Sequence, residues 1–338
     1  MDDVARFERH NLRAEAGQHF SVDGRQYILA GKLDDGAIGV VRKPTDSATQ
    51  HQVVVKFLAP ELRYIEASSL EDIHSRFRRE GERGAELNHP NLVKIIAYAE
   101  NEAGSAFRES NAPHNPFIIM EYVRGPTLES FIKSTAKQSG SHLFINQQSV
   151  AIAVGILQAL RYLHARSIVH RDVKPANIFI SKVVGNHVPL AVQVGDFGVV
   201  KWGDFKAAMT TGTLTATGQL GLGTWKYMAP EQALDAKAVE VRSDMWAVGT
   251  TLFELFTCQI LPSPHHVFRI AQQRQARLGN AVSRIYDLGL GVLPHEYRDL
   301  FTCIYDCFLG APKSRPSSAQ MLTKLQRALD DMAPDHTR

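Results

Sequence analysis

The chain has 338 residues, a formal net charge of +3 at pH 7, and 44% hydrophobic and 22% charged residues. These shares are ordinary for a globular protein with a sizeable core, and the length predicts either one large two-lobed domain or two smaller domains. Acidic and basic residues are mixed along the chain, which argues against a dedicated nucleic-acid-binding protein, so we expect no nucleic-acid partner.

The N-terminus begins MDDVARFERH, which is polar and charged and lacks the apolar core of a signal peptide. The most apolar stretch, residues 245–256, is interrupted by Glu254 and is shorter than the ~18–20 residues of a membrane helix. We therefore expect a cytoplasmic protein with no membrane partner.

The cysteines are too few and too scattered for a disulfide framework, and they are Cys258, Cys303 and Cys307. Cys303 and Cys307 would share one face of a helix and could in principle hold a metal. No His or further Cys stands at zinc-ligand spacing beside them, so we expect buried, reduced side chains instead.

Short β-branched or aromatic runs in the first third predict strands at residues 27–29, 39–41, 53–55 and 117–120. A charged helix with a narrow apolar stripe is expected at 70–87. Residues 101–116 are rich in Gly, Ser, Asn and Pro and predict a surface loop.

From Thr127 onward the apolar period lengthens, which predicts helices. One amphipathic helix is marked by a stripe that ends before Ile168 and consists of Val150, Val154, Leu157, Leu160 and Leu163. Further helical patterns lie at 243–256, 295–308 and 317–332. The pattern indicates a small strand-rich lobe followed by a larger helical lobe, with a junction near residues 121–125.

Phosphoryl transfer requires that phosphates are held, that magnesium is placed and that an acceptor hydroxyl is aimed. The run Gly31–Val41 lies between predicted strands, and its glycines would let backbone amides close over phosphates, although an ordinary hairpin turn would also fit. Lys56 ends a buried-looking strand, and Glu80 lies on the charged helix. The two side chains could form an ion pair that aims the ammonium at phosphates, or each could simply be solvated.

Two further segments carry more specific chemistry. Residues 170–177 read HRDVKPAN and follow an apolar helix, while residues 195–198 read GDFG and follow an apolar strand. Asp172 can accept a hydroxyl proton, and Asn177 and Asp196 supply the hard oxygen ligands that magnesium prefers. Turn chemistry alone does not explain both segments in this order.

Together these segments resemble the eukaryotic-type (Hanks-type) protein kinase family, from about Tyr27 to about Leu329. The style of the activation segment, which lies between Asp196 and Glu231, favours a bacterial member. The resemblance implies an α+β, bilobal protein-kinase fold, whose N-lobe has an antiparallel sheet plus helix C and whose C-lobe is mainly helical. It implies an N-terminal extension over residues 1–20, the N-lobe over 21–123, the C-lobe over 124–332 and a C-terminal tail over 333–338.

The resemblance also implies roles for individual residues. The catalytic set is Asp172 as base, Lys174 as γ-phosphate contact, and Lys56 with its helix C partner Glu80, whose register is supported by the strings FRRE at 77–80 and LNHPNLV at 87–93. The ATP-binding set is Leu33, Gly36, Gly39, Val41, Val54, Lys56, the gatekeeper Met120, the hinge residues Glu121 and Val123, and Phe179. Asn177 and Asp196 are the implied magnesium ligands. The structural and regulatory set is Arg171, Thr215, Thr217, Thr224, Glu231, Asp244 and Arg315.

Two details favour serine/threonine substrates: Lys174 stands two residues after Asp172, and Thr224 fits the threonine that bridges to the base. The resemblance therefore implies a non-specific serine/threonine protein kinase that uses ATP and Mg²⁺, with Mn²⁺ as a substitute, and acts on Ser and Thr hydroxyls of protein partners. The alternatives are a nucleotide-binding pseudokinase or scaffold, and a small-molecule kinase.

The segment between Asp196 and Glu231 is rich in threonine. Arg171, next to Asp172, marks family members that are activated by a phosphate in this segment, where it would pair with ~1.5–2 added negative charges. We predict autophosphorylation mainly at Thr215 or Thr217, in trans through self-association.

Two departures from the family pattern stand out. Asp34 replaces the first glycine of the phosphate loop, and Gly84 stands where the family usually has a bulky apolar residue. Gly81 and Gly84 each cost a helix about 1 kcal/mol relative to Ala. These glycines suggest a mobile helix C that needs a partner, a dimer contact or a phosphate to settle.

Overall fold

The structure is a computed structural model that describes residues 19–22, 25–28, 32–35, 40–42, 45–46, 52–57, 67–100, 116–139, 144–181, 191–196, 224–234, 239–260, 297–309 and 311–332. They fall into two compact units, and the main change from one to the other comes between Tyr122 and Val123. The turn His89–Leu92 belongs to the second unit although its flanking residues belong to the first.

The first unit contains two antiparallel sheets. The smaller sheet has the order β1-β2-β5, from β1 (His19–Val22), β2 (Arg25–Ile28) and β5 (Thr45–Asp46). The larger has the order β3-β4-β6-β8-β7, from β3 (Lys32–Asp35), β4 (Val40–Arg42), β6 (Val53–Phe57), β7 (Ile95–Glu100) and β8 (Pro116–Glu121). Side chains alternate across β6, so Val53 and Val55 enter the core while Lys56 points to the opposite face.

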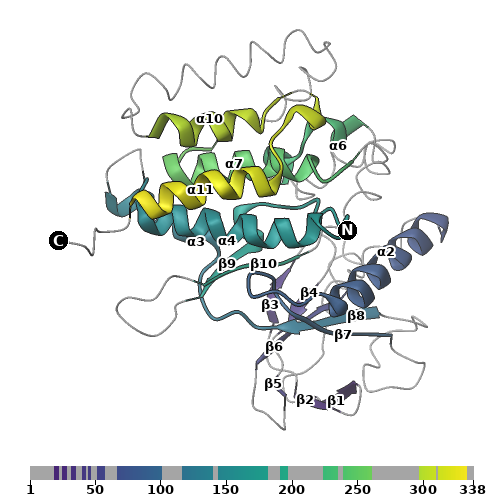
Figure 1. Ribbon diagram of the computed structural model, residues 1–338. Helices are drawn as coiled ribbons and strands as arrows, with labels where there is room; N and C mark the ends of the chain where they lie inside the picture. The colour runs from purple at the N-terminus through teal and green to yellow at the C-terminus, as the bar shows by residue number, and fades with distance from the viewer. Residues whose placement is uncertain are drawn as a thin grey trace, which may run out of the picture. The chain divides into compact units, whose positions relative to one another are not determined.

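The long helix α2 (Ala67–Glu86) packs on β7 and β8, as Figure 1 shows. Its buried positions Phe77, Glu80, Gly81 and Gly84 follow the i, i+3, i+4, i+7 spacing of one helix face. The ring of Phe77 meets that of Tyr98 edge-on, at 6.4 Å between centroids. The charged remainder of the helix is therefore left to the outer face.

Gly81 and Gly84 bring α2 close to the sheet. A Cβ at Gly81 would lie 2.6 Å from Cδ2 of Tyr98, and a Cβ at Gly84 would overlap Cδ1 of Ile95. The sequence predicts only that these glycines weaken the helix, whereas the structure gives them a packing role. The mobility of α2 stays a prediction.

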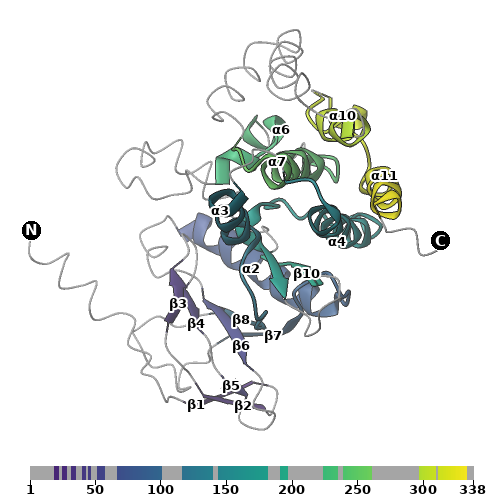
Figure 2. The same cartoon turned by 90° about the vertical axis from the view of Figure 1, so that its left-hand side faces the viewer.

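The second unit is mainly helical. It contains α3 (Leu128–Ser139), α4 (Gln147–His164), α6 (Pro230–Leu234), α7 (Ser243–Thr257), α10 (Arg298–Asp306) and α11 (Ser318–Asp331), the hairpin of β9 (Ile178–Ser181) and β10 (Ala191–Val194), and the short 3₁₀ turns η2 (Pro175–Asn177), η4 (Thr224–Tyr227) and η8 (Pro312–Ser314). Figure 2 shows α4, α7, α10 and α11 end-on and side by side. Every residue of α7 is buried, so this helix is the centre of the unit.

Local sequence signals explain where two of these helices begin. Asn146 and Ser149 form a capping box before α4, and Ser317 and Gln320 form another before α11. No helix in the described part of the chain is long and apolar enough to cross a membrane. The predicted loop at 101–116 lies almost wholly outside the described residues.

Candidate active site

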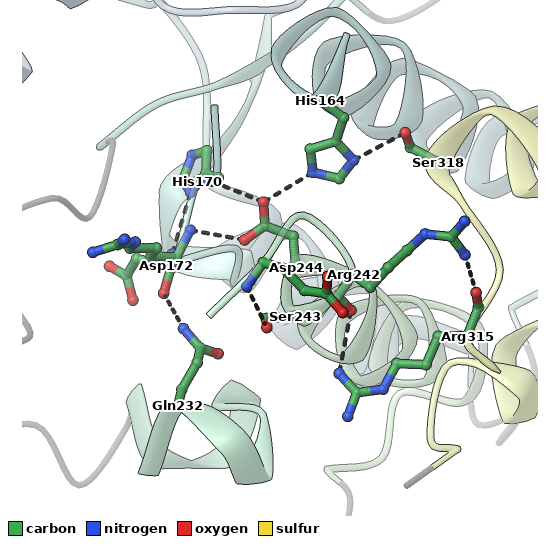
Figure 3. Close-up of polar contacts among 11 residues, drawn as sticks. His164, His170, Asp172, Gln232, Arg242, Ser243, Asp244, Arg315 and Ser318 are labelled. Carbon is green, nitrogen blue, oxygen red and sulfur yellow. Dashed lines mark hydrogen bonds and ion pairs between the residues drawn. The ribbon is translucent and has the colours of Figure 1, made fainter. Parts of the chain in front are cut away.

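The segment of residues 170–177 is held in place by a side chain of the central helix α7. Asp244 on α7 accepts the backbone N–H of His170 through Oδ2 and that of Arg171 through Oδ1, each at 2.8 Å. Arg171 has φ 69°, a left-handed conformation that few residues other than glycine adopt. One carboxylate therefore fixes the backbone immediately before Asp172, as Figure 3 shows.

Asp172 is buried and is contacted by a cation and an amide from its own segment. Nζ of Lys174 lies 3.1 Å from Oδ2 of Asp172. Nδ2 of Asn177 donates to the same carboxylate oxygen at 2.7 Å and to the backbone carbonyl of Asp172 at 2.9 Å. The structure thus brings together three of the residues that the resemblance implied for catalysis and metal binding.

Asp196 is joined to this group through the backbone. It follows β10, and the N–H of the preceding Gly195 donates to the carbonyl of Asn177 at 2.9 Å. Because Nδ2 of Asn177 is directed at Asp172, its amide oxygen is the atom that could ligate a metal. An amide oxygen beside a carboxylate suits Mg²⁺, so the donor set of Asn177 and Asp196 fits this ion.

His170 lies fully buried beside these carboxylates. Burial lowers its pKa, although the charges of Asp244, Asp172 and Asp196 act in the opposite direction. Its Nδ1 accepts the backbone N–H of Asp172 at 3.3 Å, which requires that this nitrogen is unprotonated. The ring therefore supports the backbone at Asp172.

The ion pair between Lys56 and Glu80 lies in the first unit. Nζ of Lys56 on β6 is 2.9 Å from Oε1 of Glu80 on α2, and the Glu80 side chain is 1% exposed. Nζ also lies 6.0 Å from the centroid of the Phe77 ring. A buried carboxylate and a strand lysine in this geometry fix the direction of the ammonium group.

Most of the implied ATP-binding residues lie on the described strands. Val54 on β6 pairs with Met120 on β8. Glu121 ends β8 and exchanges two hydrogen bonds with the backbone of Lys94, each at 2.9 Å. Val123 follows the main change from the first unit to the second, and Phe179 lies half-buried on β9 of the second unit. The remaining members are Leu33 on β3, Val41 on β4, and Gly36 and Gly39, which lie outside the described residues.

Asp34 lies on β3 and pairs with Val41 of β4, next to an irregularity in the register. The backbone there places this departure from the family pattern on the strand β3 itself.

Glu231 and Arg315 form a forked ion pair, with N–O distances of 2.7 and 2.9 Å. Arg315 is fully buried and donates from Nε to the carbonyl of Leu309. Its Cζ atom lies 5.3 Å from the centroid of the Trp246 ring. Thr224 lies in η4, where the structure describes its backbone but not its side chain. Thr215 and Thr217 are outside the described residues altogether.

Three features were not predicted from the sequence. His164 bridges Asp244 and Ser318, with Nε2 2.9 Å from Oδ2 of Asp244 and Nδ1 3.0 Å from Oγ of Ser318 (Figure 3). The hydroxyl of Tyr227 donates to Glu254, and burial raises the pKa of both groups.

The third feature is Gln232, whose side chain reaches the backbone of Arg171. Of the residues in these three features, only Glu254 stands out in the sequence, because it is a carboxylate inside the most apolar stretch. His164 and Gln232 contact backbone or buried groups across the fold, which no local pattern reveals.

Comparisons with known proteins agree with this geometry. The family model for the protein kinase domain matches residues 27–325. The chain is 34% identical over 235 residues to the probable serine/threonine-protein kinase PknB of Bifidobacterium longum, which covers 69% of this chain and 30% of that protein. It is also 34% identical over 232 residues to the serine/threonine-protein kinase PknB of Mycobacterium leprae, which covers 69% of this chain and 32% of that protein. The chain thus spans about a third of the length of these relatives.

The fold is also similar to a crystal structure of a double mutant of the Mycobacterium tuberculosis PknI kinase domain. The TM-score is 0.60 at 20% identity, and the match covers 94% of this chain and 100% of the other. This likeness confirms the predicted α+β protein-kinase fold. The chain therefore belongs to the protein kinase domain family, and within it to the Hanks-type kinases of bacteria.

Proposed function

We propose that this chain is a serine/threonine protein kinase that transfers the γ-phosphate of ATP to Ser and Thr hydroxyls of proteins. The observation that carries the proposal is the group around Asp172, in which Lys174 and Asn177 both contact one carboxylate oxygen and Gly195 ties Asp196 to Asn177. This group combines a proton acceptor, a cation and two oxygen donors for a metal.

In the proposed reaction, Asp172 accepts the proton of the acceptor hydroxyl while the hydroxyl oxygen bonds to the γ-phosphorus. The bond from that phosphorus to the oxygen of the β-phosphate breaks, and ADP leaves. Lys174 would stabilise the negative charge of the transferred group, and Lys56, oriented by Glu80, would contact the phosphates of ATP. Asn177 and Asp196 would hold Mg²⁺, which neutralises phosphate charge when it is bound, and Mn²⁺ would serve as a substitute.

Proteins rather than metabolites are the proposed substrates. Lys174 beside Asp172 and the serine/threonine kinase names of the bacterial relatives support this choice. We also propose cytoplasmic action, trans-autophosphorylation through self-association, and lobes that span residues 21–123 and 124–332.

The test is transfer of label from γ-labelled ATP with Mg²⁺ to a generic basic protein, with Asp196→Ala as the control. Labelled protein with wild type and none with Asp196→Ala is the expected result. Nucleotide binding without transfer would indicate a pseudokinase, and label on small metabolites without protein label would indicate a small-molecule kinase. Either outcome would overturn the proposal.

A further inference from the structure

Gln232 links the helix after Glu231 to the backbone of the 170–177 segment. Its side chain is 4% exposed. Oε1 accepts the backbone N–H of Ala229 at 2.9 Å, and Nε2 donates to the backbone carbonyl of Arg171 at 3.3 Å. Figure 3 shows the side chain rising from α6 toward the backbone beside Asp172. Both ends of one amide are thus used, on two segments that lie about sixty residues apart in the chain.

The carbonyl that Gln232 contacts belongs to the peptide unit between Arg171 and Asp172. The N–H of the same peptide donates to Nδ1 of His170, and the N–H of Arg171 itself is held by Asp244. Arg171 has the left-handed φ of 69° that side chains rarely favour, so this peptide needs external support to stay in place. Gln232 supplies that support on the carbonyl side.

A simpler role for Gln232 must be separated from this one. It stands three residues after Ala229, where a Gln side chain commonly caps a helix by accepting the first backbone N–H. Capping uses only the oxygen of the amide. The contact with Arg171 uses only the nitrogen, so the two roles can be tested independently.

We propose that Gln232 is a positioning residue that holds the Arg171–Asp172 peptide and so sets the direction of the Asp172 carboxylate for phosphoryl transfer. This inference rests on the proposed function. The same side chain fastens Ala229, at the end of the threonine-rich segment. It therefore couples the placement of residues 229–232 to the placement of Asp172.

The deciding variant is Gln232→Glu, which keeps the capping oxygen and removes the donor to Arg171. We expect kcat to fall about tenfold, the size of effect that follows from the loss of one buried hydrogen bond, with KM for ATP close to wild type. Gln232→Met, which removes both bonds, should lower kcat similarly and also lower the melting temperature.

The matched control is Gln320→Glu. Gln320 caps α11 through the same kind of bond, from Ser317 N–H to Oε1 at 2.8 Å, and the 170–177 segment is no part of that bond. The kcat of the Gln320→Glu variant should equal that of wild type.

Wild-type kcat in folded Gln232→Glu, with only Gln232→Met affected, would assign Gln232 to capping alone and overturn the inference. If Gln232→Glu does not fold, folded Gln232→Met with wild-type kcat overturns it equally. An inactive wild type would instead count against the proposed function, so the two failures are distinguishable.

Discussion

Asp244 places each of its two carboxylate oxygens on a backbone N–H of the 170–177 segment. His164 and Ser318 extend this contact to α4 and α11, so the residues before Asp172 are fixed by side chains from the helical core. The position of Asp172 is therefore supported by individual side chains that need not touch a substrate. The resemblance pointed to Asp244, but it gave no indication of His164 or Ser318.

Two histidines, the buried His170 and the half-buried His89, make the stability depend on pH. Burial lowers the pKa of His170, and burial together with Arg161 and Arg166 lowers that of His89, below the ordinary value of 6.5. An unfolded chain then binds more protons than the folded chain below about pH 6.5, so the free energy of unfolding is full above that pH and falls as the pH drops toward the folded pKa values.

Urea unfolding at about pH 7.5 and about pH 5.5 measures this effect. The matched variant is His89→Asn, because an Asn oxygen can still accept the N–H of Asn91 that Nδ1 of His89 accepts at 3.1 Å. We expect wild type to lose more stability on acidification than His89→Asn. Equal losses in the two proteins would contradict the assignment of His89.

At the scale of elements, α2 and β7 approach each other closely through Gly81 and Gly84. Gly81→Ala should lower stability by about 1–3 kcal/mol, because the new methyl meets Cβ as well as the ring of Tyr98 and must push the helix away. The Lys56–Glu80 contact would lengthen, and kcat should fall with it. Gly84→Ala should cost less, because the end of the Ile95 side chain can rotate away.

Thermal unfolding and kcat of the two variants test this packing role. Helix propensity alone would make each Ala variant about 1 kcal/mol more stable, so increased stability in Gly81→Ala is the contrary result. The predicted mobility of α2 is a separate matter, which hydrogen exchange measures: slow exchange across residues 77–87 in the unphosphorylated monomer would show that it is wrong.

The ion pair between Arg315 and Glu231 fastens α6 to the turn before α11. Arg315→Met should lower the free energy of unfolding by about 3–5 kcal/mol, because it breaks a buried, forked pair. Urea unfolding checks this, with Arg327→Met, an exposed change on α11, as the control. A loss no larger than that of the control would mean that the pair adds little to stability.

Elements with strong local signals could be predicted from the sequence. The stripe from Val150 to Leu163 indicated α4, and the expected helices at 243–256 and 317–332 agree closely with α7 and α11. The helix α3 and the strand β7 were missed. Leu128 and Ile132 are buried on α3, but two such positions among polar residues make too weak a stripe.

The same limit applies to the site. Asp172, Asn177 and Asp196 stand in motifs because their chemistry is local to short segments. Gln232 and Gly81 owe their roles to contacts with distant segments, which only the folded chain brings to them.

At the scale of the whole molecule, control of activity is expected to depend on the threonine-rich segment and on Arg171. We predict phosphate mainly on Thr215 or Thr217 after incubation with ATP and Mg²⁺, since a phosphate there would bring ~1.5–2 negative charges for Arg171 to pair with. Phosphosite mapping by mass spectrometry measures this, and a rate that rises with protein concentration would indicate reaction in trans. No phosphothreonine between residues 196 and 231 would contradict the prediction.

We propose that Asp172 enables this chain to phosphorylate proteins on Ser and Thr. The most direct measurement is phosphoamino-acid analysis of a basic protein labelled from γ-labelled ATP by wild type and by Asp172→Asn. We expect phosphoserine and phosphothreonine with wild type and a loss of at least about a hundredfold with Asp172→Asn, within the range that general-base catalysis contributes. Equal labelling by both proteins, or no labelling by wild type, would contradict it.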